Sequence, residues 1–237
     1  MASNVGEIES KVAERLQDQL SILSKARGPG AISRAIASAV EQYSKDRPLE
    51  KAVAVDGDGG FDYALPSGFT DGFSLVQAIF YPYETTDQDP PALDPDEWTL
   101  FRTATGLKIR FLADSPTAAE DFLVQYTAPH TLSAATSTIP ATDDEAVADL
   151  AAAEAYLMLA GYFAVQANDN SISVDSVDRR TKAQECRDQS AAYRKSYARK
   201  IGADTETVRP ASAWGDVDSA FGDFTRSDYF AHGRRRF

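Results

Sequence analysis

The sequence predicts an α+β protein in which a small antiparallel β-sheet or sandwich is inserted into a four-helix bundle and followed by an extended C-terminal arm. Three observations support this prediction. Apolar residues recur every three or four positions before residue 50, as in amphipathic helices. The period shortens toward two between residues 51 and 130, where glycine and proline clusters separate short runs. Helical spacing then returns up to residue 202, after which the composition changes.

Residues 1–50 are expected to form the N-terminal helices of the bundle. The first helix ends at Gly28-Pro29-Gly30, because glycine suits a helix C-terminus and proline cannot continue the hydrogen-bond ladder. The second helix begins at Ile32 and ends near Asp46, before Pro48. The first helix carries an apolar stripe of Ile8, Val12, Leu16, Leu20 and Leu23.

Residues 51–130 are expected to form the inserted β domain. Thr105-Gly106 is a turn signal between two strand-like runs, which predicts a hairpin. Trp98 begins one of these runs, so we expect it in the core. The strand-like runs are Lys51–Val55, Phe61–Tyr63, Leu75–Tyr81, Trp98–Arg102, Leu107–Phe111 and Phe122–Tyr126.

Residues 131–202 are expected to complete the bundle with two helices. Thr142 and Glu145 have the spacing of a capping box, which predicts a helix from there to about Val165. Its many alanines let other helices approach closely, so we expect it at the bundle centre. The last helix runs from about Ser176 to Gly202. Its expected buried stripe is Cys186, Ser190, Tyr193, Tyr197 and Ile201.

The exposed face of the last helix is basic, with eight cationic side chains against three acidic ones. If the protein forms a ring, this face could line a DNA passage or contact a neighbouring subunit. A solvated face, or one paired with acidic segments such as Glu84–Glu97, explains the same pattern. The candidate residues on this face are Arg179, Arg180, Lys182, Arg187, Arg194 and Lys195.

Composition and charge exclude several classes of protein. With 36 acidic and 24 basic side chains, the net charge of −12 argues against a protein that coats DNA. A single cysteine and two distant histidines argue against a disulfide or a metal centre. The residues at the start of the chain show no secretory signal, so we expect an intracellular protein. The longest uncharged apolar run, Ala155–Val165, is shorter than the about 20 residues of a membrane span.

No motif in the sequence indicates catalysis or a cofactor. Asp56–Gly60 begins like a calcium loop, but Gly60 and Ser67 occupy positions that need ligands, so a polar turn is favoured. His130 lacks an accompanying nucleophile motif and is interpreted as anchoring a turn by hydrogen bonds. Cys186 lies on an apolar stripe and is interpreted as a small buried hydrophobic residue. We therefore expect no enzyme, no cofactor and no metal.

The arm, residues 203–237, has many aromatic residues but only two aliphatic ones, Val208 and Val217. That composition cannot build a core, so we expect the arm to become ordered on a partner, with packing back onto its own bundle as the alternative. Aromatic and arginine side chains are common anchors of protein interfaces. The expected interface residues are Trp214, Phe221, Phe224, Tyr229, Phe230, Arg234, Arg235, Arg236 and Phe237.

Several local strings, taken in order, resemble a known family. They are Tyr43–Pro48 (YSKDRP), Leu65–Phe69 (LPSGF), Phe73–Pro82 (FSLVQAIFYP), Tyr126–Thr131 (YTAPHT), Thr138–Pro140 (TIP) and Ser173–Val177 (SVDSV). This series, between about residues 30 and 202, resembles the head–tail connector adaptor proteins of tailed bacteriophages.

The resemblance implies a structural protein of the virion neck that is present in the host cytoplasm during assembly. Such adaptors form a ring, commonly twelve-fold, beneath the portal protein and join it to the next neck or tail component. Genomic DNA passes through the ring without sequence-specific contacts, and the C-terminal segment reaches into the portal. Two other functions are weighed against this one: a ligand- or glycan-binding β module on a helical stalk, and an enzyme, which the missing catalytic motifs disfavour.

Overall fold

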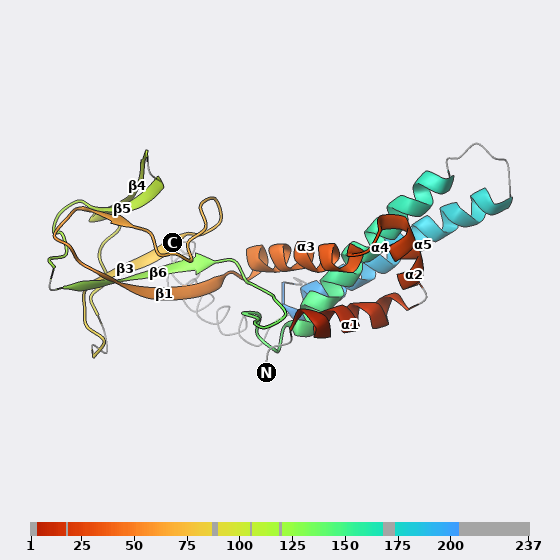
Figure 1. Ribbon diagram of the computed structural model, residues 1–237, viewed down its shortest axis with the longest axis horizontal. Helices are drawn as coiled ribbons and strands as arrows, with labels where there is room; N and C mark the ends of the chain where they lie inside the picture. Colours follow the sequence, from red (N-terminus) through yellow and green to blue (C-terminus); the bar gives the residue numbers. More distant parts are fainter. Residues whose placement is uncertain are drawn as a thin grey trace, which may run out of the picture. The chain divides into compact units, whose positions relative to one another are not determined.

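The computed structural model describes residues 4–17, 19–86, 90–104, 106–118, 120–167 and 174–203, and it is a mixture of helices and antiparallel sheets (Figure 1). Two compact units are present. The sheet unit comprises Met1–Lys11 and Ile32–Asp144, and the helical unit comprises Val12–Ala31 and Glu145–Phe237. The α+β class predicted from the sequence is therefore confirmed.

The sheet unit contains helix α3 (Ala31–Asp46) and strands that form two three-stranded antiparallel sheets. One sheet has the order β1-β6-β3 and the other the order β2-β5-β4. The strands, all at expected positions, are β1 (Leu49–Asp56), β2 (Asp62–Ala64), β3 (Val76–Tyr83), β4 (Trp98–Thr103), β5 (Gly106–Phe111) and β6 (Asp121–Ala128).

Both sheets contribute to one core in the sheet unit. Phe122 of β6 contacts Tyr63 of β2 and Phe111 of β5, with ring centroids 4.8 and 5.1 Å apart. Trp98 packs against this cluster, as predicted. The turn at Gly106 also forms as predicted, because Thr103 pairs directly with Gly106, whose φ of 129° disfavours a side chain.

The N-terminal helical segment differs from the prediction of one continuous helix. It forms α1 (Val5–Leu16) and α2 (Gln19–Arg27), separated at Gln17, whose φ is +46°. A residue in this left-handed conformation ends the right-handed hydrogen-bond ladder. Leu16 and Leu23 are nevertheless both buried, so the predicted stripe is retained on each side of the break.

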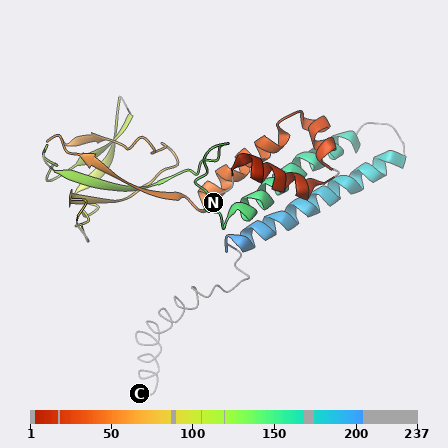
Figure 2. The same cartoon turned by 60° about the horizontal axis from the view of Figure 1, so that its bottom comes forward.

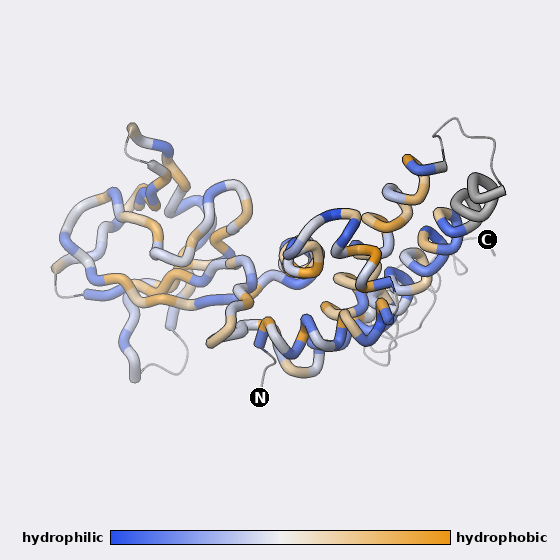
Figure 3. Tube along the Cα trace, turned by 45° about the vertical axis from the view of Figure 1, so that its right-hand side comes forward, coloured by the Kyte–Doolittle hydropathy of each residue, from blue (hydrophilic) through white to orange (hydrophobic). Residues whose placement is uncertain are grey.

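Helices α4 (Asp144–Ala167) and α5 (Val174–Lys200) run side by side in the helical unit (Figure 2). The hydropathy trace in Figure 3 shows apolar and polar residues interleaved along the helices. Cys186, Ser190, Tyr197 and Ile201 of the predicted α5 stripe are buried, and Tyr193 is half-buried.

Helix α4 begins at Asp144, close to the start predicted from Thr142 and Glu145. The Thr142 hydroxyl donates to the Asp143 carboxylate, and Glu145 pairs with Arg15. By length and composition the segment Asp144–Gln166 could cross a membrane, but 67% of its most apolar window is buried inside the protein. That burial is typical of a core helix, and it accounts for the apolar composition of the segment.

Candidate functional site

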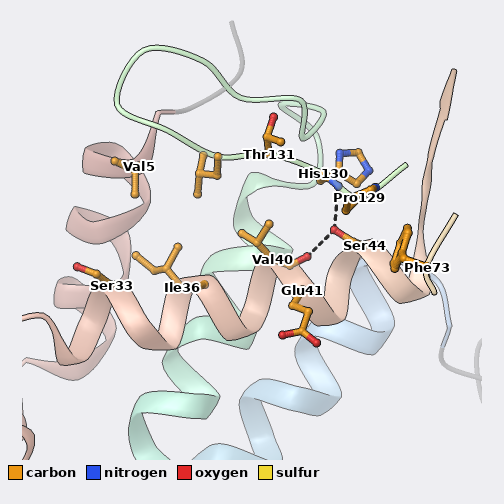
Figure 4. A pocket seen from close by; sticks show the side chains of 12 residues that line it. Val5, Ser33, Ile36, Val40, Glu41, Ser44, Phe73, Pro129, His130 and Thr131 are labelled. Carbon is orange, nitrogen blue, oxygen red and sulfur yellow. Dashed lines mark hydrogen bonds between the residues drawn. The ribbon is translucent and has the colours of Figure 1, made fainter. Parts of the chain in front are cut away.

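An apolar groove of about 440 Å³ lies along one side of α3 in the sheet unit (Figure 4). Helix α3 provides its floor through Ile36, Ala37 and Val40. Val5 of α1 and Phe73, from the turn before β3, contribute two further apolar walls. The remaining lining residues are Ser33, Glu41, Ser44, Pro129, His130, Thr131 and Leu132.

The groove exists because the segment after β6 is fixed against α3. The Ser44 hydroxyl donates to the Val40 carbonyl over 2.7 Å and accepts the backbone N–H of His130 over 2.9 Å (Figure 4). These two bonds satisfy polar groups that burial would otherwise leave unpaired. The chain from Pro129 onward is therefore fixed along the groove.

His130 anchors this segment, as the sequence predicted. Its ring nitrogens lie 3.0 Å from the carbonyl oxygens of Thr138 and Arg47. Its ring also lies against that of Tyr43, with centroids 5.0 Å apart. The histidine thus joins α3 to the connector that follows β6, and it holds one end of the groove.

Asp143 provides a second link to α3, through a buried carboxylate. It accepts hydrogen bonds from the Tyr43 hydroxyl over 2.6 Å and from Arg47 over 2.8 Å. Burial alone would raise the pKa of Asp143, but these hydrogen bonds and the charge of Arg47 lower it below its ordinary value. Burial and the bond to Asp143 raise the pKa of Tyr43.

In the helical unit, Asp149 fixes the end of α5. Its side chain, which is 5% exposed, accepts bonds from Arg15 (2.8 Å), Lys200 (2.7 Å) and Ser196 (2.7 Å). Helix α5 ends at Lys200, and Gly202 follows it with a φ of +65° that is typical of a glycine C-cap, while Ile201 between them is buried. The residues beyond 203 therefore start from a fixed point.

The described cations on the basic face of α5 are exposed, and some of them also interact within the protein. Lys182 and Arg187 are exposed, whereas Arg194 pairs with Glu154 of α4 over 2.8 Å. Lys195 is also exposed, but it makes interactions within the protein. The side chains of Arg179 and Arg180 lie outside the described residues. Arg194 is still exposed, with 52% of its side chain accessible, so the pairing offsets its charge without removing it from the surface.

The arm residues predicted as an interface all lie outside the described residues: Trp214, Phe221, Phe224, Tyr229, Phe230, Arg234, Arg235, Arg236 and Phe237. Their expected role stays a prediction. The groove beside α3 was not predicted from the sequence at all. Its only signal was the α3 stripe containing Ile36 and Val40, which was assigned to the core.

The aromatic side chains of the sheet unit are mostly directed into the core. Phe61 and Phe101 are the exceptions among large aromatic residues of the described part, with 52% and 40% exposure. The guanidinium of Arg110 lies 4.0 Å from the centre of the Phe101 ring, in a cation–π contact. Phe101 is therefore partly covered, so it is a poor platform for a sugar ring.

The residues considered for chemistry occupy structural positions. Asp58 accepts a bond from the Gly60 backbone in a turn after β1, as predicted. Cys186 is buried, and burial raises the pKa of its thiol, as predicted for a structural cysteine. No group of three or more potential metal ligands occurs within the described part of the chain.

A second, more polar cavity of about 370 Å³ lies in the helical unit. Tyr156 of α4 and Tyr193 of α5 stack beside it, with ring centroids 5.8 Å apart and planes 14° from parallel. Arg15 and Cys186 also line it. Arg15 is already bonded to Glu145 and Asp149, which makes this region part of the packing of the helical unit.

Comparison with known proteins does not identify the chain. No model of a known protein family matches it, and no curated protein sequence matches it.

Proposed function

We propose that this chain is a structural adaptor of a tailed-phage neck, assembled as a ring on the portal protein and linking it to the next neck component. The ordered series of strings between about residues 30 and 202 supports this proposal, and so does the α+β architecture. The finer arrangement, a four-helix bundle carrying a β insertion and an extended arm, belongs to the same proposal.

The observation that carries the proposal is the fixed origin of the arm. Lys200 and Ser196 bond to Asp149, and the helix ends at a left-handed glycine. A connector that holds two rings in a fixed orientation benefits from such an origin, because a flexible tether carries tension but does not fix orientation. The aromatic and arginine residues beyond it supply interface anchors.

Ring assembly offsets the entropic cost of ordering these arms. Ordering a segment on a partner costs on the order of 2–5 kcal/mol. Subunits held side by side meet their partners at high effective concentration, so weak single contacts combine into a stable assembly. The exposed cations that would face passing DNA or a neighbouring subunit include Lys182, Arg187, Arg194 and Lys195.

Electron microscopy of the purified chain mixed with the portal protein of the same genome tests this function. Rings seated on the portal are the expected result. Monomers that ignore the portal but bind an array of glycans would instead support the β-module alternative.

A matched pair of variants tests the arm. Deleting residues 203–237 is expected to abolish portal binding, whereas a control chain with Phe61→Ser and Phe101→Ser in the sheet unit keeps it. Unchanged portal binding by the deletion variant would contradict the role of the arm.

A further inference from the structure

The net charge of the protein resides entirely in the sheet unit. Residues Met1–Lys11 and Ile32–Asp144 contain 20 acidic and 8 basic side chains, a difference of −12. The helical unit, with the remaining residues, contains 16 of each and is neutral. A partner segment that binds the sheet unit is therefore favoured when it is cationic.

The α3 groove combines an apolar interior with carboxylates at its edge. Glu41, with a side chain 70% exposed, lines it directly and also pairs with Lys45. The lining residue Ser33 donates to the carboxylate of Glu9 over 3.0 Å. Such a site fits a segment that places large apolar side chains beside positive charges.

The C-terminal end of this chain has that chemistry. Tyr229 and Phe230 are adjacent aromatic residues, Arg234–Arg236 follow after a short spacer, and Phe237 comes next. Residues 204–228 separate this segment from the fixed end of α5. When extended at about 3.3 Å per residue, they span on the order of 80 Å, which is enough to reach a neighbouring molecule.

We propose that the segment Tyr229–Phe237 of one copy docks in the α3 groove of a second copy. The aromatic pair enters the groove beside the exposed Ala37, above the buried Ile36 and Val40, and the arginines lie toward Glu41 and Glu9. Each copy then donates its arm to one neighbour and receives an arm from another. This head-to-tail contact closes into a ring when the rotation between copies permits.

This docking rests on the proposed function in one respect, because the ring supplies the second copy. It also gives two parts of the arm different partners. The distal segment joins neighbouring copies, which leaves Trp214, Phe221 and Phe224 for the portal. The groove is open to such a segment, because Ala37 and Glu41 are both exposed within it.

Cross-linking between full-length chains tests the contact without any portal protein. In a Cys186→Ser background, one chain carries Ala37→Cys and the other carries Ala231→Cys, which keeps both aromatic side chains of the arm, and a short bismaleimide is added to the mixture. We expect about tenfold more cross-linked dimer than from a control pair in which Ala52→Cys, on the exposed part of β1, replaces Ala37→Cys.

Equal cross-linking in the two pairs would overturn the proposal. So would a cross-link that forms only within a single chain carrying both cysteines, because the arm would then occupy the groove of its own copy. Portal binding is measured separately from this cross-link. Portal binding without the cross-link would therefore contradict the docking but not the proposed function.

Variants with the native cysteine provide a second readout. Ala37→Trp fills the groove and Glu41→Lys reverses the charge at its edge, and both are expected to reduce self-association measured by light scattering. Ala52→Trp, a matched substitution on an exposed β1 site, is expected to leave it unchanged. Self-association that resists both groove variants contradicts the docking.

Discussion

The Tyr43 hydroxyl donates a 2.6 Å hydrogen bond to the carboxylate of Asp143, joining two residues that are 100 positions apart in the sequence. Arg47 bonds to the same carboxylate, and the His130 ring packs against Tyr43. The end of α3 and the connector after β6 are thereby held together. Because α3 forms the floor of the groove and the segment after β6 also lines it, this cluster supports the candidate site.

Tyr43→Phe is expected to lower the free energy of unfolding by about 2 kcal/mol near neutral pH, because a buried carboxylate loses a hydrogen bond. The pKa of Asp143 lies below its ordinary value of 3.8 in the folded protein. The stabilisation is therefore complete above that pH, and it is lost as the pH falls through the lower folded pKa. Urea unfolding measures the difference between wild type and variant, which should shrink in strong acid.

The matched control for this prediction is Tyr83→Phe, a half-buried tyrosine of β3. Its stability should follow that of the wild type at every pH. If the difference in the free energy of unfolding between wild type and Tyr43→Phe stays constant down to strongly acidic pH, the charge of Asp143 does not strengthen its hydrogen bond with Tyr43.

Asp149→Asn is expected to destabilise the helical unit by about 3 kcal/mol, because it leaves Arg15 with a weakened partner in a buried setting. Arg15 is 15% exposed, and its pKa is raised: burial opposes this shift, but the bonds to Glu145 and Asp149 outweigh it. Asp71→Asn, which breaks an exposed pair with Arg102, should have no measurable effect. Equal stability of the two variants in urea would contradict the central role of Asp149.

The strands were predictable from the sequence because each one alternates or is rich in β-branched and aromatic residues, and turn residues separate them. Gly106, for example, marks a hairpin through its local chemistry alone. The break at Gln17 was not predictable in this way. Glutamine carries no signal for a left-handed conformation, so tertiary packing decides where α1 ends.

The groove could not be predicted because it arises from contacts between distant segments. Val40 and His130 both occur in patterns that indicate core or turn positions, and neither pattern says that the two residues line one cavity. The role of Asp149 was equally unpredictable, since the presence of an acidic residue in an alanine-rich helix does not reveal which residues it contacts. Long-range ion pairs depend on the packing of whole elements, which periodicity does not encode.

Cys186 is expected to react slowly with a thiol reagent in the native protein. Its side chain is buried, and the raised pKa reduces the fraction of reactive thiolate. A cysteine placed at Gln184, an exposed position on the same helix, should react about a hundredfold faster in a Cys186→Ser background. If the cysteines at positions 186 and 184 react with the reagent at comparable rates in the folded protein, this part of α5 opens readily.

Gly202→Ala is expected to lower the free energy of unfolding by about 1 kcal/mol, because its φ of +65° is costly for a residue with a Cβ atom. The Ala203 N–H bonds to the Ala198 carbonyl over 2.8 Å, so strain at Gly202 loosens the whole terminal turn of α5. Hydrogen exchange at Tyr197–Ala203 should accelerate, whereas Gly6→Ala, within the first turn of α1, leaves it unchanged. If the adaptor proposal is correct, Gly202→Ala also weakens portal binding, because the arm then starts from a mobile end. Unaltered exchange in that turn would mean that the bonds of Lys200 and Ser196 to Asp149 suffice to fix the origin of the arm.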